Sequence, residues 1–127
     1  MKGLLDTHTF IWWDSDPDRL SDRARAFILD PSNEALLSVV SVWEIVIKRA
    51  LGNLHLHRPI DGIVIDQTAN GIAILPVVLE HVLAVAGLPA IHGDPFDRLL
   101  IAQAKVEGAA MVSGDPLIAR YDVPIIW

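Results

Sequence analysis

The amino-acid sequence predicts an α/β fold, a three-layer α/β/α sandwich with a central parallel sheet of four to five strands. Two observations support this class: short apolar runs alternate with patterns of helical period, and several helical patterns begin or end on capping residues. No internal repeat, low-complexity tract or linker divides the 127 residues, so we expect one domain over residues 1–127.

The strands are expected at five short apolar runs. They lie at residues 2–6, 35–40, 72–77, 109–113 and 123–127. Each run has the length of a strand that is buried on both faces, and helical patterns separate the first four runs. Strands joined through helices run parallel, so their carboxyl ends should meet at one edge of the sheet, where open α/β sheets bind ligands.

The helices are expected at six segments with helical patterns. They lie at residues 8–13, 21–30, 41–52, 60–70, 79–87 and 95–107. The second pattern opens on Ser21, a residue type that caps helices. The third opens on Ser41 and closes at Gly52, and the last opens on Asp94 and closes at Gly108.

The composition excludes several kinds of site. The chain has no cysteine, which excludes a disulfide framework, a thiolate zinc site and a cysteine nucleophile. Charged residues break the longest apolar runs, so neither a signal peptide nor a membrane span fits, and we expect a cytoplasmic protein. The net charge of −6 argues against a broad basic face for nucleic acid, although acids gathered in one cleft would leave local positive patches.

Four carboxylates stand at places that the predicted topology brings to one edge of the sheet. Asp6 ends the first strand, and Glu44 lies in the first turn of the helix after the second strand. Asp97 lies at the start of the helix that leads back to the fourth strand, and Asp115 follows that strand. Carboxylates gathered at one place repel one another, and a bound divalent cation relieves this repulsion. The pattern therefore predicts a site for Mg²⁺ or Mn²⁺, hard ions that prefer oxygen ligands and assist phosphate chemistry.

Most of these acids also have a structural interpretation. Glu44 falls at the last position of the capping-box pattern SVWE, and Asp115 precedes a proline as a helix cap would. Asp94 suits a helix cap, which leaves Asp97 as an acid of the first turn that the helix dipole favours. Asp6 has no such explanation, because burying an unpaired charge at the end of a strand costs several kcal/mol. Asp6 therefore indicates function most strongly.

Other polar and aromatic residues give weaker signals. The histidines show no metal-binding spacing and are expected on the surface or in packing, with His8 lining the cleft. The tryptophans Trp12, Trp13, Trp43 and Trp127 are expected in packing or in an interface rather than as base-stacking platforms. The basic residues that could contact a phosphate are Lys48, Arg49, Arg58 and, as the best candidate because it neighbours an acid, Arg98.

Four segments resemble the acidic motifs of the PIN-domain ribonucleases, and specifically of the VapC toxins of prokaryotic toxin–antitoxin pairs. They are LLDTHTFIWW, SVVSVWEIVIK, HGDPFDRLLIAQA and VSGDP, and their order and spacing fit the family over nearly the whole chain. The resemblance implies the three-layer fold and RNA cleavage that depends on Mg²⁺ or Mn²⁺. It makes Asp6, Glu44, Asp97 and Asp115 the metal-binding, catalytic acids. The last motif often reads Thr-x-Asp in the family and reads Ser-Gly-Asp here, which retains the hydroxyl.

The same motifs contain residues that would support the acids. Thr7 and Ser113 would orient a water or a carboxylate, Asp94 would support the site from the helix cap, and Arg98 would contact the substrate phosphate. The resemblance further implies a VapB-like antitoxin as partner, and we expect a homodimer or a toxin–antitoxin hetero-oligomer. The mean hydropathy of +0.40 favours some apolar surface that a partner covers.

Two other classes of protein remain open. A catalytically silent PIN-like module that binds RNA or protein would have lost one or more of the acids, and none is missing. A phosphoacceptor domain would pair a second acid with Asp6 and carry a lysine after its last strand, and a phosphatase would need Asp-x-Asp where this chain has Asp6-Thr7-His8. Both phosphate-transfer classes fit the sequence poorly.

Overall fold

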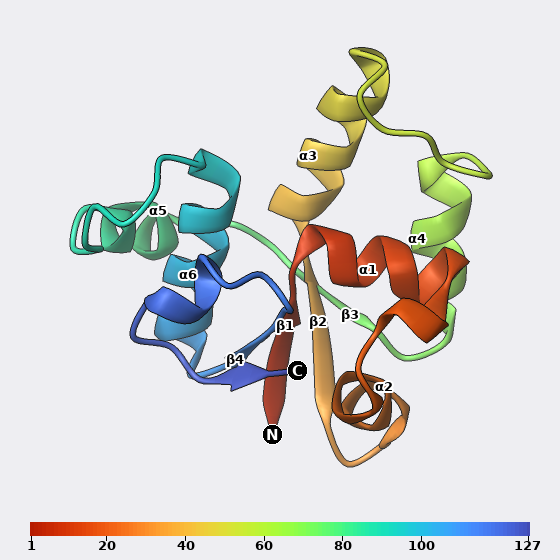
Figure 1. Ribbon diagram of the computed structural model, residues 1–127, viewed down its shortest axis with the longest axis horizontal. Coiled ribbons are helices and arrows are strands. Elements are labelled where there is room, and N and C mark those ends of the chain that lie inside the picture. Colours follow the sequence, from red (N-terminus) through yellow and green to blue (C-terminus); the bar gives the residue numbers. More distant parts are fainter.

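The computed structural model describes all residues, 1–127, and shows one five-stranded sheet in the order β3-β2-β1-β4-β5 with every pair parallel (Figure 1). The strands are β1 (Lys2–Leu5), β2 (Glu34–Ser38), β3 (Ala73–Leu75), β4 (Ala110–Val112) and β5 (Ile125–Ile126). The predicted parallel sheet is confirmed, and each strand falls within or one residue before the apolar run that predicted it.

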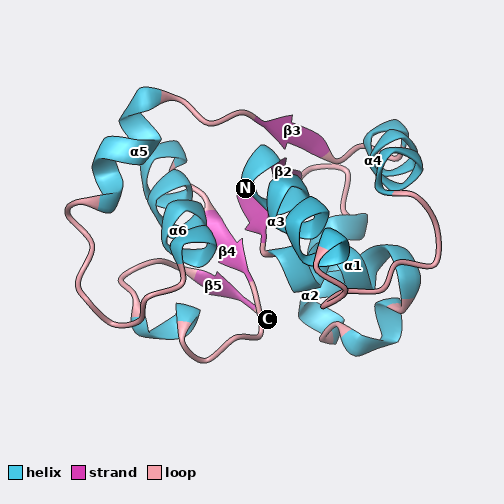
Figure 2. Ribbon diagram, turned by 90° about the horizontal axis from the view of Figure 1, so that it is seen from above, coloured by secondary structure: helices cyan, strands magenta, loops and turns pink.

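Six α-helices connect and cover the strands. They are α1 (Thr7–Ser15), α2 (Asp22–Leu29), α3 (Val39–Ala50), α4 (Ile60–Ala69), α5 (Leu79–Val85) and α6 (Pro95–Glu107). Figure 2 shows α1, α2 and α4 on one side of the sheet and α5 and α6 on the other, so the predicted three-layer α/β/α arrangement is confirmed. No helix is both long and apolar enough to cross a membrane.

The core consists of two apolar layers, one on each face of the sheet. Alternate residues of each strand enter opposite layers: Leu5 packs with the α1, α2 and α4 layer, whereas its neighbour Leu4 packs with the α6 layer. Gly3 lets α2 approach β1 closely, because a Cβ there would lie only 2.5 Å from the ring of Phe27. Both faces are therefore covered, which explains why the strands read as continuous apolar runs.

The helix boundaries confirm most of the predicted caps. Ser21 accepts a hydrogen bond from the amide of Ala24, and Asp94 accepts from the amides of the first turn of α6. Gly108 ends α6 in the left-handed conformation, with φ of 66°. These three positions show that local capping chemistry fixes where α2 and α6 begin and where α6 ends.

The predicted start of α3 at Ser41 is wrong. The helix begins at Val39, directly after the last strand residue, and Ser38 is its cap because its hydroxyl accepts a hydrogen bond from the Val40 amide at 3.0 Å. The apolar run continues from the strand into the first helical turn, so composition does not mark the boundary. Glu44 consequently lies in the second turn of α3, and the capping-box interpretation of this acid is also wrong.

Candidate active site

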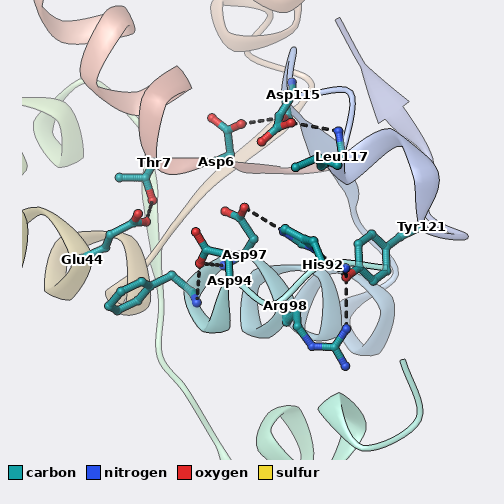
Figure 3. A network of polar contacts seen from close by, with 12 residues as sticks. Asp6, Thr7, Glu44, His92, Asp94, Asp97, Arg98, Asp115, Leu117 and Tyr121 are labelled. Carbon is teal, nitrogen blue, oxygen red and sulfur yellow. Dashed lines mark hydrogen bonds and ion pairs between the residues drawn. The ribbon is translucent and has the colours of Figure 1, made fainter. Parts of the chain in front are cut away.

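The four predicted acids lie at the carboxyl edge of the sheet and come from four different segments (Figure 3). Asp6 joins β1 to α1, Glu44 lies on α3, Asp97 lies in the first turn of α6, and Asp115 follows β4. The arrangement follows from the parallel topology, since every β-to-α connection leaves the sheet at this edge.

Asp6 is buried, with 6% of its surface exposed, and both of its oxygens are hydrogen-bonded. It caps α1: Oδ1 accepts from the Thr9 amide at 2.7 Å, while Oδ2 accepts from the Ser113 hydroxyl. The expectation that Asp6 has no structural role is therefore wrong, because the chain turns into α1 immediately after β1. The cap compensates part of the cost of burying this carboxylate near other acids.

Glu44 is 2% exposed and is held by one hydroxyl and one ammonium group. Thr7 donates to Glu44 Oε1 at 2.6 Å, and Lys48, one helical turn further along α3, pairs with Oε2. The hydrogen bond to the Glu44 carboxylate raises the pKa of Lys48, so this lysine stays charged beside the acids. Thr7 thus lies beside Glu44, as the sequence predicted for a supporting residue of the site.

Asp97 has the most perturbed carboxyl group of the site. Its pKa is raised to about 6: burial raises it most, the negative charges of Asp94 and Glu44 also raise it, and the hydrogen bond from His92 opposes them. Asp94 itself uses one oxygen to cap α6, accepting from the amides of Phe96 and Asp97 at 2.9 and 3.1 Å. Negative charge is therefore gathered around Asp97.

A chain of hydrogen bonds that the sequence did not predict orients Asp97. Arg98 has no acceptor atoms, so its Nη1 donates to the Tyr121 hydroxyl at 3.1 Å, and that hydroxyl is left to donate to Nδ1 of His92 at 2.7 Å. The remaining nitrogen, Nε2 of His92, then carries the proton and donates to Asp97 Oδ2 at 3.1 Å. His92 is the residue beside the acids that the sequence did not indicate, because its link to Tyr121 exists only in the folded chain.

Arg98 does not join the acids. Its guanidinium also donates to the carbonyl oxygen of Pro89 at 2.8 Å, and Figure 3 shows it pointing away from the carboxylates. Its predicted phosphate contact stays a prediction, and the placement of this side chain gives it no support. Among the basic groups, Lys48 and Arg19 lie beside the predicted acids instead.

Asp115 is positioned by its own turn and by Ser113. Its Oδ1 accepts from the Leu117 amide at 2.9 Å, as in a capped turn, and its amide donates to the Ser113 hydroxyl oxygen at 3.1 Å. Since the Ser113 hydroxyl donates to Asp6, this buried serine connects the first and last acidic motifs. The hydroxyl of the last motif thus has the supporting contact that the sequence predicted.

The donor set fits a hard divalent cation in its chemistry. The groups offered are carboxylate oxygens, and the pKa of Asp97 is raised mainly by burial and further by the charges of Asp94 and Glu44, which an ion would neutralise. No three of the carboxylate and imidazole groups converge closely enough to hold an ion in the arrangement that the structure shows. Each acid is instead engaged by the hydroxyl, amide, imidazole or ammonium groups described above.

Comparison with known proteins agrees with this architecture. The family model of the PIN domain matches residues 3–124. The chain is 27% identical to ribonuclease VapC22 of Mycobacterium tuberculosis over 122 residues, which cover 95% of this chain and 92% of that protein.

Solved structures share the fold at low sequence identity. VapBC2 of Rickettsia felis, bound to a DNA fragment from its promoter, matches with a TM-score of 0.72 at 14% identity, covering 98% of this chain and 97% of that one. DNA-bound VapBC of Salmonella typhimurium matches with a TM-score of 0.68 at 16% identity, covering 98% and 96%. With the sheet order, the acids at its carboxyl edge and a family model that spans nearly all of the sequence, this chain belongs to the PIN domain family.

Proposed function

We propose that this PIN domain is an endoribonuclease that depends on Mg²⁺ or Mn²⁺ and acts as the toxin of a toxin–antitoxin pair. The observation that carries the proposal is the set of four carboxylates, from four segments, at the ligand-binding edge of the sheet. The similarity to a ribonuclease over 92% of that protein's length supports the choice of RNA as substrate.

In this proposal Asp6, Glu44, Asp97 and Asp115 hold the ion directly or through water. A bound Mg²⁺ or Mn²⁺ would bind a phosphate oxygen, lower the pKa of a water and stabilise the charge that develops during in-line displacement. No side-chain nucleophile is needed, in accord with the absence of cysteine.

The residues around the acids fix their orientation. Thr7 holds Glu44, and Ser113 holds Asp6. The proton on Nε2 of His92 holds one oxygen of Asp97 and leaves the other available. Lys48 keeps a positive charge beside Glu44, where it can attract the phosphate of an incoming RNA.

The proposed partner is a small VapB-like antitoxin. The two solved structures compared above are VapBC complexes, and this chain presents large apolar side chains to solvent. Leu79 and Leu83 of α5 are 72% and 64% exposed, while Trp43 of α3 and Leu51 at its end are 58% and 69% exposed. Such surfaces are expected where another chain binds, in a homodimer or in a complex with the antitoxin.

The nuclease proposal is tested with purified protein and total RNA. We expect new RNA ends in Mg²⁺ or Mn²⁺ and none in excess EDTA, and sequencing of the ends locates the cleaved bonds. Asp6→Asn should lower the cleavage rate by about 100-fold or more, while the cap of α1 survives because asparagine caps as well as aspartate. Asp122→Asn, which removes the same charge from an exposed position, is the matched control. Full cleavage in EDTA would overturn the proposal.

The toxin proposal is tested in cells. Expressed alone, the wild type should arrest growth and Asp6→Asn should not. Co-expression of the product of an adjacent short reading frame should restore growth, and the two chains should co-purify. Harmless expression of protein that cleaves RNA in vitro would refute the toxin role and leave the nuclease chemistry standing.

A further inference from the structure

A cleft of about 520 Å³ opens beside two of the acids, Asp6 and Asp115. Its size falls within the range of about 300–1,000 Å³ that is usual for small-ligand sites. The other lining residues are His8, Trp12, Arg19, Gly114, Pro116 and Trp127. The expected packing of Trp12 and Trp127 is confirmed, because both lie against the core, and the fold also brings these two residues from distant parts of the chain beside the acids.

The aromatic groups of the cleft do not stack on one another. Trp12 and Trp127 have ring centroids 6.4 Å apart and planes inclined at 53°, and His8 is inclined at 47° to Trp12. If these rings were stacked in parallel, each would cover a face of its neighbour, and that face could not contact a ligand. The inclined rings do not cover one another, although Arg19 lies over the Trp12 ring and both indoles also pack against the core.

Gly114 has no side chain, and this leaves the space that the Trp127 indole occupies. A Cβ at Gly114 would lie 2.5 Å from Cε2 and 2.8 Å from both Nε1 and Cζ2 of the indole, so the glycine lies against the ring. Any other residue in the middle of the last acidic motif would displace Trp127. The glycine of the Ser-Gly-Asp sequence therefore holds an aromatic side chain next to Asp115.

Arg19 supplies positive charge to the same wall. Its guanidinium carbon lies 4.4 Å from the centre of the Trp12 ring, a cation–π contact that orients the arginine without neutralising it. The cleft thus combines an unpaired positive charge, inclined aromatic rings and two of the acids within one space. A nucleotide has the matching parts, a planar base and an anionic phosphate.

We propose that this cleft binds an unpaired RNA base adjacent to the cleaved phosphodiester bond, with the base stacked on Trp12 or Trp127 and a flanking phosphate near Arg19. The inference rests on the proposed ribonuclease function and adds the requirement for a single-stranded nucleotide at a fixed distance from the bond that is cut. Stacking tolerates every base, so the cleft selects unpaired RNA more than a particular sequence.

The test uses a single-stranded RNA oligonucleotide that contains a mapped cleavage site, with an abasic ribose placed at each flanking position in turn. The wild type should lose about 10- to 100-fold in kcat/KM when the abasic ribose occupies one particular position, as expected for one lost stacking interaction. Trp127→Leu and Trp12→Leu should lose a similar factor on intact RNA and little more on that abasic RNA. Trp127→Phe should retain most of the activity, because the ring still stacks.

Trp13→Phe is the matched control on α1. The Trp13 indole donates a hydrogen bond to Gln67 at 3.0 Å and does not line the cleft. The dependence of kcat/KM on the position of the abasic ribose should therefore be the same in Trp13→Phe as in the wild type. His8→Ala changes an exposed wall residue without disturbing the core and should weaken RNA binding even if the tryptophan variants unfold. Thermal melting checks the fold of each variant.

A binding measurement separates this inference from the nuclease proposal. RNA should quench the tryptophan fluorescence of Asp97→Asn protein, and Trp12→Leu combined with Asp97→Asn should reduce that quenching. If the wild type cleaves RNA, but no position of the abasic ribose lowers kcat/KM and the Trp12→Leu change leaves the quenching unaltered, the proposal of a base-binding cleft is wrong while the nuclease proposal stands. If Trp12→Leu no longer binds the antitoxin and no position of the abasic ribose lowers kcat/KM, the base-binding proposal is also wrong, because the cleft would then bind a protein.

Discussion

Replacing Asp97 by asparagine should stabilise the protein at neutral pH when no metal is present. Burial and the neighbouring charges raise the pKa of this carboxyl from its ordinary value of 3.8 to about 6. A pKa raised by this amount corresponds to roughly 3 kcal/mol of free energy that disfavours the charged carboxylate in the folded protein. The side chain is 18% exposed, so solvent screening lowers the expected effect to about 1–2 kcal/mol.

The pH dependence gives this prediction its sign. Between about pH 4 and pH 6 the native state binds a proton at Asp97 that the unfolded chain has released, so the wild type loses stability as the pH rises through this range. The amide that replaces the carboxyl group in the variant is neutral at every pH. Asp97→Asn should therefore be about 1–2 kcal/mol more stable than the wild type at pH 7.5, and the difference should vanish near pH 4.

Urea unfolding in EDTA, followed by circular dichroism from pH 4 to pH 8, measures this difference. Asp122→Asn removes one negative charge from an exposed position and should follow the wild type at each pH. An Asp97→Asn variant that is less stable at pH 7.5, or whose stability difference does not change with pH, would refute the conclusion that burial and neighbouring charges disfavour the ionised form of this acid.

Three further substitutions test other parts of the structure. Glu44→Gln keeps the shape of the side chain and removes its charge, so RNA cleavage should fall about 100-fold or more while urea unfolding changes by less than about 1 kcal/mol. Arg58→Met removes the charged partner of the buried Asp14 carboxylate, 2.6 Å away, and should lower the urea midpoint in the same assay. Gly114→Ala should push the Trp127 indole aside, changing the tryptophan emission spectrum and costing about 1–3 kcal/mol of stability. Unchanged emission from a folded Gly114→Ala protein would contradict the described packing.

The sequence was sufficient for the sheet and for the segments that carry the acids. Residues such as Leu4 and Leu5 belong to apolar runs covered on both faces, and capping residues such as Asp94 act through neighbouring amides, so both signals are local. The sequence does not locate the start of α3, because Ser38 and Ser41 are both plausible caps and only the tertiary structure distinguishes them. No local pattern distinguishes these two serines.

The contacts between distant segments could not be predicted. His92 reaches Asp97 through an orientation that Tyr121 fixes, and Trp12 meets Trp127 from the opposite end of the chain. Each of these pairs depends on how β4 and β5 are placed relative to β1, which a single sequence does not encode in any local pattern.

The direct passage from β2 into α3 limits how this part of the chain can change in length. Ser38 is both the last residue of the strand and the cap of the helix, so no loop separates Glu44 from the sheet. Inserting or deleting one residue between them would turn Glu44 by about 100° around the helix axis and carry it out of the site. We therefore expect length variation among functional homologues to fall outside the junction, for example in the segment between α3 and α4, where a longer connection leaves every acid in register with the sheet.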